Sequence, residues 1–162
     1  MRTTLCALVG MAAIVAAAQS SLAAVAPPNP KDLTQGTWEL NLAKSKFCEP
    51  APQKSTREII DAGWGLIVVH WTGIDAAGKS MDVRYVWRYV GAKYPAEINK
   101  PADESISWKL VNPSRVEFTH WSKSDKVTST YVRTVSADGQ TMTQTGKFVG
   151  KPCETSQVFD RQ

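Results

Sequence analysis

The chain has little of the chemistry on which most enzymes rely. Its 162 residues include only two histidines and three cysteines, and the cysteines form no Cys-x-x-Cys pair. No glycine-rich phosphate loop, Gly-x-Ser-x-Gly turn or His-Glu-x-x-His motif occurs. No second cluster of metal-binding residue types accompanies the histidines. The composition therefore predicts no catalytic constellation, no metal site and no cofactor.

Helical periodicity is scarce as well. Runs rich in Val, Ile, Thr, Trp and Tyr alternate with short turn sequences such as Asn112-Pro113 and Asp138-Gly139. Strands are predicted at Gly36–Leu42, Thr56–Ala62, Gly65–Asp75, Lys79–Val90, Ser105–Val111, Arg115–Ser122, Lys126–Ser136, Thr141–Val149 and Glu154–Arg161. The long connection 91–104 is expected to be either a lid or an inert solvated loop. This pattern predicts an all-β, antiparallel meander of eight or nine strands.

Alternation along these strands predicts how the sheet is covered. Val83, Tyr85, Trp87 and Tyr89 share one face of a strand whose other face is charged. The same spacing groups Trp64, Leu66, Val68 and His70; Ile106, Trp108 and Leu110; and Val116, Phe118 and His120. With so little helix available, closure into an up-and-down β-barrel is the economical way to bury these faces, and a two-sheet sandwich is the alternative.

The N-terminal 23 residues have the parts of a secretory signal peptide. Leu5–Ala18 form an uncharged apolar run, and Ser21–Ala23 offer small residues for cleavage. The run is shorter than the ~20 residues of a spanning helix, so a retained membrane anchor is only the alternative. A proline-rich arm is expected at 24–33 and one domain at 34–162. We expect a monomer without a membrane anchor, in the periplasm or secreted.

Two cysteines, Cys48 and Cys153, remain after such cleavage. Export would expose them to an oxidising environment, where a bridge closing so long a loop stabilises by about 4 kcal/mol. A Cys48–Cys153 disulfide is therefore predicted, and two buried free thiols are the alternative.

The two histidines, His70 and His120, are each followed by tryptophan and a small hydroxyl residue. Strand alternation places both among apolar neighbours, which predicts that both face inward. A pair of inward imidazoles could hold a metal or haem iron, or act as acid and base. The alternatives are hydrogen-bonded wall positions, or Trp71 and Trp121 facing inward instead.

Six tryptophans and four tyrosines suit either ordinary core packing or an aromatic-walled pocket for a flat or apolar ligand. The candidate ligand-binding residues are Trp64, Tyr85, Trp87, Tyr89, Trp108, Phe118, His70 and His120. Basic residues are scattered over the probable outer faces, which is typical of a solubilising surface, and a nucleic-acid partner is not expected.

Gly36-Thr37-Trp38-Glu39-Leu40 resembles the first-strand Gly-x-Trp signature of lipocalins. Together with Lys44–Phe47 and Ser136–Thr143, it makes the chain similar to a group of small exported bacterial lipocalin-like proteins. The resemblance implies a calycin-type barrel that binds a small, largely apolar molecule. It also implies that an arginine packs on Trp38 to close the barrel floor, with Arg161 in the matching place and Arg133 as second choice.

The expected function is therefore binding or carriage of a small hydrophobic or aromatic molecule inside the barrel. One rival is an enzyme on the same scaffold, an isomerase or cyclase that uses His70 or His120 as acid or base. A second rival is a filled-core envelope interaction module with no ligand.

Overall fold

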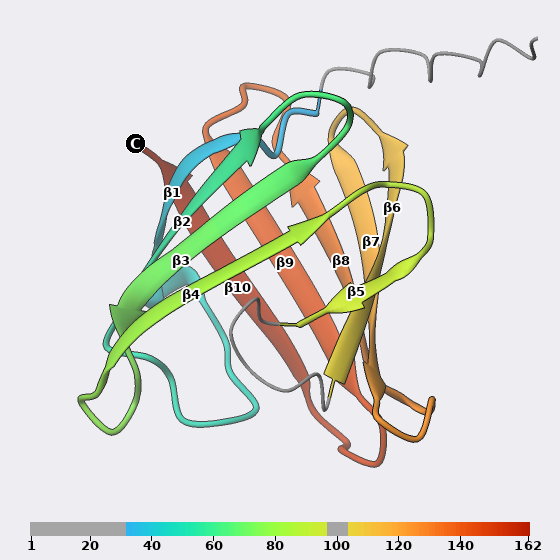
Figure 1. Ribbon diagram of the computed structural model, residues 1–162. Coiled ribbons are helices and arrows are strands. Elements are labelled where there is room, and N and C mark those ends of the chain that lie inside the picture. Colours follow the sequence, from blue (N-terminus) through green and yellow to red (C-terminus); the bar gives the residue numbers. More distant parts are fainter. Residues whose placement is uncertain (1–31, 97–103) are drawn as a thin grey trace, which may run out of the picture.

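The computed structural model describes residues 32–96 and 104–162. Their strands form one antiparallel sheet (Figure 1). The strands are β1 (Gly36–Leu40), β2 (Lys54–Asp61), β3 (Ile67–Ile74), β4 (Ser80–Trp87), β5 (Lys93–Pro95), β6 (Glu104–Asn112), β7 (Arg115–Ser122), β8 (Val127–Val135), β9 (Thr141–Phe148) and β10 (Glu154–Arg161). A single 3₁₀ turn, η1 (Leu42–Lys44), follows β1. The predicted signal peptide and most of the predicted arm lie outside the described residues.

The strand order makes the sheet a nearly closed barrel. It runs β4-β3-β2-β1-β10-β9-β8-β7-β6-β5, so all chain neighbours except β4 and β5 are also sheet neighbours, and β1 pairs with β10. The two ends of this order, β4 and β5, are consecutive in the chain and face each other as the sheet curls round (Figure 1). The predicted all-β up-and-down barrel is confirmed, and the sandwich alternative is not what the chain adopts.

The strand count is ten rather than eight or nine, because β5 lies in the connection 91–104 where no strand was predicted. Its three residues pair with β6, with Tyr94 opposite Ile106. Pro95 ends the strand at the edge of the sheet, where a missing N–H donor is tolerated. So short an edge strand has no alternation to detect. The lid prediction for this connection concerns residues that lie mostly outside the described part of the chain.

The inward face of β3 is the opposite of the one predicted. Ile67 and Val69 are buried, whereas His70 lies on the outer wall. The hairpin before β3 explains the difference, because Gly63, Trp64 and Gly65 all have positive φ and interrupt the extended backbone. Alternation counted from Trp64 therefore starts out of phase with the strand.

The barrel floor is closed by Arg161 and Trp38. The guanidinium carbon of Arg161 lies 4.1 Å from the centroid of the buried Trp38 ring. Its nitrogens donate to the carbonyl oxygens of Leu33, Gln35 and Gly139 at 2.6–2.9 Å. Through this cation–π contact and these three hydrogen bonds, Arg161 holds the end of β10 against the chain before β1 and the β8–β9 turn.

Glycine is required at position 36 by this arrangement. The φ of Gly36 is +125°, and a Cβ there would lie 2.4 Å from Nη1 of Arg161. The Gly-x-Trp spacing in this sequence therefore has a steric cause.

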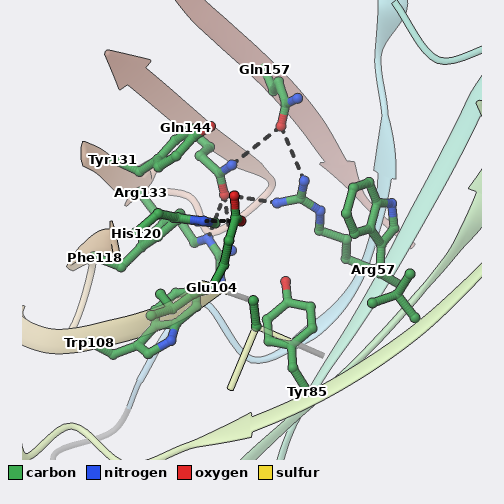
Figure 2. Close-up of a pocket in the computed structure, with 14 residues that line it drawn as sticks. Arg57, Tyr85, Glu104, Trp108, Phe118, His120, Tyr131, Arg133, Gln144 and Gln157 are labelled. Carbon is green, nitrogen blue, oxygen red and sulfur yellow. Dashed lines mark hydrogen bonds and ion pairs between the residues drawn. The ribbon is translucent and has the colours of Figure 1, made fainter. Parts of the chain in front are cut away.

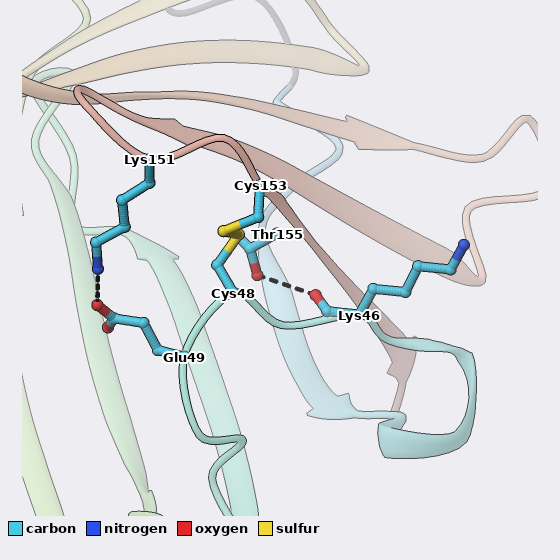
Figure 3. The surroundings of a disulfide bond; sticks show 6 residues. All are labelled: Lys46, Cys48, Glu49, Lys151, Cys153 and Thr155. Carbon is cyan, nitrogen blue, oxygen red and sulfur yellow. Dashed lines mark hydrogen bonds and ion pairs between the residues drawn. A yellow bond between two sulfur atoms is a disulfide. The ribbon is translucent and has the colours of Figure 1, made fainter.

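At the other end of the barrel, a disulfide joins Cys48, after η1, to Cys153, before β10 (Figure 3). The two Cα atoms are 5.7 Å apart, within the usual range for such a bridge. Lys46 pairs with Ser156 through two backbone hydrogen bonds, and Lys151 forms an ion pair with Glu49. The predicted disulfide is confirmed, and it holds the β1–β2 connection against the start of β10.

Replacing Arg161 by Met should lower the free energy of unfolding by about 2–4 kcal/mol, because three carbonyl groups lose their donor and Trp38 loses its cation. Urea denaturation followed by tryptophan fluorescence measures the change. The matched control is Arg84→Met on the exposed face of β4, which should stay within about 0.5 kcal/mol of the wild type. Equal effects in both variants would contradict the role given to Arg161.

Removing the bridge by the double substitution Cys48→Ala and Cys153→Ala should cost about 2–5 kcal/mol, because the unfolded chain regains the entropy of a long loop. Denaturant titrations with and without dithiothreitol measure this cost. Reductant should shift the wild type towards the variant and leave the variant itself unchanged. A wild type insensitive to reductant would show that the bridge contributes nothing.

Candidate functional site

A cavity of about 270 Å³ lies inside the barrel. Its walls come from eight strands, β2 to β4 and β6 to β10, and from Ala96, which follows β5. The lining residues are Arg57, Trp71, Val83, Tyr85, Ala96, Glu104, Ile106, Trp108, Phe118, His120, Tyr131, Arg133, Gln144 and Gln157. One side is aromatic and the other is polar, so the cavity presents two different chemistries to whatever it holds.

The aromatic side is a continuous stack of rings. Trp108 stacks on Phe118 with centroids 4.1 Å apart, and Phe118 stacks on Tyr131 at 4.8 Å. Tyr85 lies nearly parallel to Trp108 at 6.2 Å. Each of these residues sits at an inward position of its strand, as the alternation of buried residues requires. The stack offers a continuous apolar surface along one wall.

The stack also bridges the open seam of the sheet. Trp87, the last residue of β4, stacks on Trp108 of β6 with centroids 3.9 Å apart and planes 10° apart. These strands are not hydrogen-bonded neighbours in the sheet order. Trp87 is fully buried beneath the cavity rather than lining it.

The polar side is built around two buried arginines that share one glutamine (Figure 2). Arg57 of β2 donates to Oε1 of Gln144 at 2.8 Å, and Arg133 of β8 donates to the same oxygen at 3.0 and 3.3 Å. Gln157 accepts from Arg57 at 3.2 Å and from Nε2 of Gln144 at 3.3 Å. The cluster therefore joins β2 to β8, β9 and β10 across the interior.

Neither arginine has an acidic partner among the described residues, although they are only 4% and 0% exposed. Burial lowers the pKa of Arg57 to about 10, partly opposed by Tyr85 and reinforced by Arg133. Both guanidinium groups remain charged at neutral pH. Within the described part of the chain, Nε of Arg57 and Nη1 of Arg133 are buried without a hydrogen-bond partner. The cavity thus holds two positive charges with unused donors.

Aromatic faces partly compensate these charges. Arg57 lies 5.0 Å from the Trp71 ring and 4.7 Å from the Phe159 ring. Arg133 lies 5.4 Å from both Trp108 and Phe118. Such contacts stabilise a cation by about 0.5–2 kcal/mol, well below the several kcal/mol that desolvating an ion costs.

Tyr131 joins the aromatic and polar sides because its cross-strand neighbour is a glycine. Tyr131 of β8 lies opposite Gly146 of β9, and a Cβ on Gly146 would come within 2.1 Å of the tyrosine ring. The missing side chain lets the ring lie across the backbone of β9. Burial raises the pKa of the Tyr131 phenol, which therefore stays protonated and can donate a hydrogen bond.

His120 faces the cavity, as predicted from its strand. Its ring lies 5.3 Å from Tyr131 and 5.9 Å from Phe118, and its Nδ1 is 4.0 Å from Oε2 of Glu104. Burial, with Arg57 adding to it, lowers the pKa of His120 to about 4. The imidazole is therefore neutral at physiological pH in the empty cavity.

His70 does not share that cavity, and the prediction that it faces inward is wrong. It lies on the outer wall, where its Nε2 is 2.9 Å from Oδ1 of Asp82. Its neighbour Trp71 faces inward instead and donates to Oγ of Ser55 at 2.8 Å. The alternative stated for this His-Trp pair is therefore correct for Trp71. Trp121 lies on the other side of β7 from His120 and donates to Oγ of Ser107.

Four of the eight predicted ligand-binding residues line the cavity: Tyr85, Trp108, Phe118 and His120. Trp64 is 90% exposed at the tip of the β2–β3 hairpin. Tyr89 lies near the floor, where its hydroxyl donates to Asp32 at 2.5 Å. The structure therefore does not bring Trp64, Trp87, Tyr89 or His70 into the lining.

The polar side of the cavity was not predicted from the sequence, although β9 carries a signal for part of it. In β9, Met142 is the apolar residue that marks the inward face, and Gln144 and Gly146 follow it at the same phase. In β2, Ile59 and Ile60 point to opposite faces, so alternation alone could not decide whether Arg57 faces inward. Arg133 had been considered only for the floor.

A second, more open cavity of about 410 Å³ adjoins the first at the disulfide end. It shares Trp71, Tyr131 and Gln157 with the inner cavity. Apolar side chains of the β1–β2 connection, including Phe47 and Pro50, form its rim. An elongated molecule could therefore reach from this end to the arginines.

Within 32–96 and 104–162, no group of three or more His, Cys, Asp or Glu side chains could hold a metal ion. No helix among these residues is long and apolar enough to cross a membrane.

No protein-family model and no curated protein sequence matches the chain. Solved structures do match its fold. The fluorescent protein UnaG superposes with a TM-score of 0.60 and 15% identity, covering 79% of this chain and 96% of that one. Fatty-acid-binding protein 1 of Echinococcus granulosus gives 0.56 and 14%, covering 80% and 97%. As-p18, an extracellular fatty acid binding protein, gives 0.54 and 13%, covering 82% and 99%. The chain has the calycin-type fold of fatty-acid-binding proteins.

The lowered pKa of His120 predicts acid sensitivity of the empty protein. In the unfolded chain this histidine binds a proton below about pH 6.5, whereas in the folded state it does so only below about pH 4. The free energy of unfolding therefore falls as the pH drops from about 6.5 to about 4. Substituting His120 by Gln should remove about 1–2 kcal/mol of the loss between pH 7 and pH 5. Urea titrations at both pH values measure it, with His70→Gln on the outer wall as the matched control. An unchanged loss in His120→Gln would refute the assignment.

Proposed function

We propose that this protein binds and carries a small hydrophobic or aromatic molecule that bears one anionic group. The observation that carries the proposal is the pair of buried arginines, Arg57 and Arg133, which face one cavity without an acidic partner among the described residues. Interior cavities of several hundred cubic ångströms count against the rival hypothesis of a filled-core module without a ligand.

An anion is the ligand group that the polar side fits best. Two desolvated guanidinium groups with unused donors cost free energy in the empty protein. A carboxylate, sulfonate or phosphate placed between them would form charge-assisted hydrogen bonds and neutralise the excess charge. The neutral oxygens of Gln144 and Gln157 accept hydrogen bonds from the arginines but cannot neutralise their charge.

The body of the ligand is assigned to the aromatic stack. Rings stacked at 4–5 Å spacing present a continuous apolar surface that suits a largely apolar or aromatic skeleton. A longer apolar part would extend into the outer cavity towards Phe47 and Pro50. Two of the structural neighbours are fatty-acid-binding proteins, and fatty acids combine an apolar body with one carboxylate.

We further propose that the protein acts after export, in the periplasm or outside the cell, as a monomer. The disulfide supports this placement because such bridges persist in oxidising compartments. The predicted signal peptide supports it from the sequence.

The rival enzyme hypothesis now concerns His120 alone, since His70 lies outside the cavity. A neutral imidazole beside Glu104 could accept a proton from a bound molecule. The arginine pair requires only binding, so carriage is the simpler function and turnover remains a prediction to be tested.

A matched pair of fluorescent probes tests the proposal. 8-Anilinonaphthalene-1-sulfonate and N-phenyl-1-naphthylamine share an aromatic skeleton, but only the first carries an anion. We expect the sulfonate to bind the wild type with one site, and Arg57→Met to weaken it by about 10- to 100-fold, the range for losing a charge-assisted contact. The neutral probe should bind both proteins alike.

The same variant has a second readout. Removing one uncompensated buried charge should leave the empty protein as stable as the wild type or more so, since Gln144 and Gln157 keep their other donors. Arg84→Met on the outer wall is the control and should change neither property. Equal loss of both probes in Arg57→Met, or no binding of the sulfonate, would contradict the proposal.

A further inference from the structure

Building on the proposed function, we infer that His120 is a proton-dependent contact for the ligand's anionic group. It joins Arg57 and Arg133 in the complex only when it carries a proton. Filling the site therefore takes up a proton, and binding tightens as the pH falls.

The geometry places His120 among the groups that would hold the anion. It lines the same cavity as both arginines, and Figure 2 shows its imidazole pointing into the space that Arg57 and Gln144 also approach. Its ring packs between Phe118 and Tyr131 on the aromatic wall. The imidazole thus stands where the aromatic and polar sides of the cavity meet.

Five other titratable or charged side chains line the cavity with His120, and the remaining strands that line it, β3, β9 and β10, contribute only uncharged side chains. The five are Glu104 from β6, Tyr131 and Arg133 from β8, Arg57 from β2 and Tyr85 from β4. Glu104 approaches to 4.0 Å, but its side chain is 55% exposed and largely solvated. The empty cavity is therefore dominated by the two arginine charges, which disfavour a third positive charge.

A bound anion reverses that balance. It cancels the field of Arg57, which together with burial holds the pKa of His120 down at about 4. It also attracts the imidazolium directly, and an opposite charge within hydrogen-bonding range favours the charged form. Reciprocity then requires that a protonated His120 strengthens the binding of the anion by the same factor.

The size of the effect follows from the shift. If the anion restores the pKa of His120 only to the ordinary value of about 6.5, affinity rises about 20-fold between pH 7 and pH 5. A group that titrated equally in the free and bound states would give no change at all.

Glu104 is the competing explanation for any acid tightening. Its carboxylate repels an anion, and protonating it would relieve that repulsion without any contact from His120. The two variants His120→Gln and Glu104→Gln separate these causes, because Gln keeps the hydrogen-bonding capacity of each side chain and removes its titration.

The experiment measures the Kd of 8-anilinonaphthalene-1-sulfonate from about pH 8 to about pH 5, over which its sulfonate stays ionised. Near-UV circular dichroism at each pH checks that the protein stays folded. For the wild type we expect tightening of tenfold or more. Calorimetry at about pH 6 in buffers of different ionisation enthalpy should show net proton uptake, which His120→Gln should abolish together with the tightening.

The outcomes decide the inference separately from the proposed function. Tightening that survives in His120→Gln and disappears in Glu104→Gln would assign the effect to the carboxylate and overturn the inference. A wild-type Kd that does not change with pH would also overturn it, while leaving an Arg57-dependent carrier intact. Failure of the sulfonate to bind at any pH would overturn both.

Discussion

Two positive charges inside a β-barrel constrain everything else in its interior. Arg57 of β2 and Arg133 of β8 meet at a single amide, Gln144. Neither could be buried without an acceptor and an aromatic face, and the inward positions of the neighbouring strands supply both. Large apolar side chains in their place would have filled the centre. The arginines instead keep it polar and leave space beside it.

The interior is divided by strand rather than mixed. The rings of β4, β6 and β7 form one wall, and the amides and guanidinium groups of β2, β9 and β10 form the other. The strand β8 contributes to both, through Tyr131 and Arg133 on successive inward positions. In a ligand with an apolar body and an anionic end, the body would contact the aromatic wall and the anionic end would contact the guanidinium groups.

Much of the fold could be predicted because the relevant signals are local. Alternation and turn residues locate nine of the ten strands, and Gly36 and Trp38 mark the closed end through a steric requirement. The strand β5 escapes detection because three residues have no period. The phase of β3 fails because the hairpin at Trp64 adds residues with positive φ, which alternation cannot register.

Of the candidate site, the aromatic side could be predicted from the sequence and the polar side could not. Aromatic residues on clearly alternating strands, such as Tyr85 and Trp108, were placed correctly. The arginines were not, since a charged side chain on a strand is normally taken to face solvent. In β2 the apolar residues on both faces left nothing to contradict that assumption. Only the closure of the sheet, a long-range property, decides which face is inside.

The contact between Trp87 and Trp108 gives the barrel wall an unusual seam. Between every other pair of adjacent strands, the wall is held by a backbone ladder, whose hydrogen bonds break together if the strands part. The two ends of the sheet order, β4 and β5, form no such ladder, and there Trp87 of β4 stacks face to face on Trp108 of β6, the strand beside β5. A contact between two rings imposes no strand register, so the sheet is joined to itself along this edge without the residue-by-residue alignment that each ladder requires.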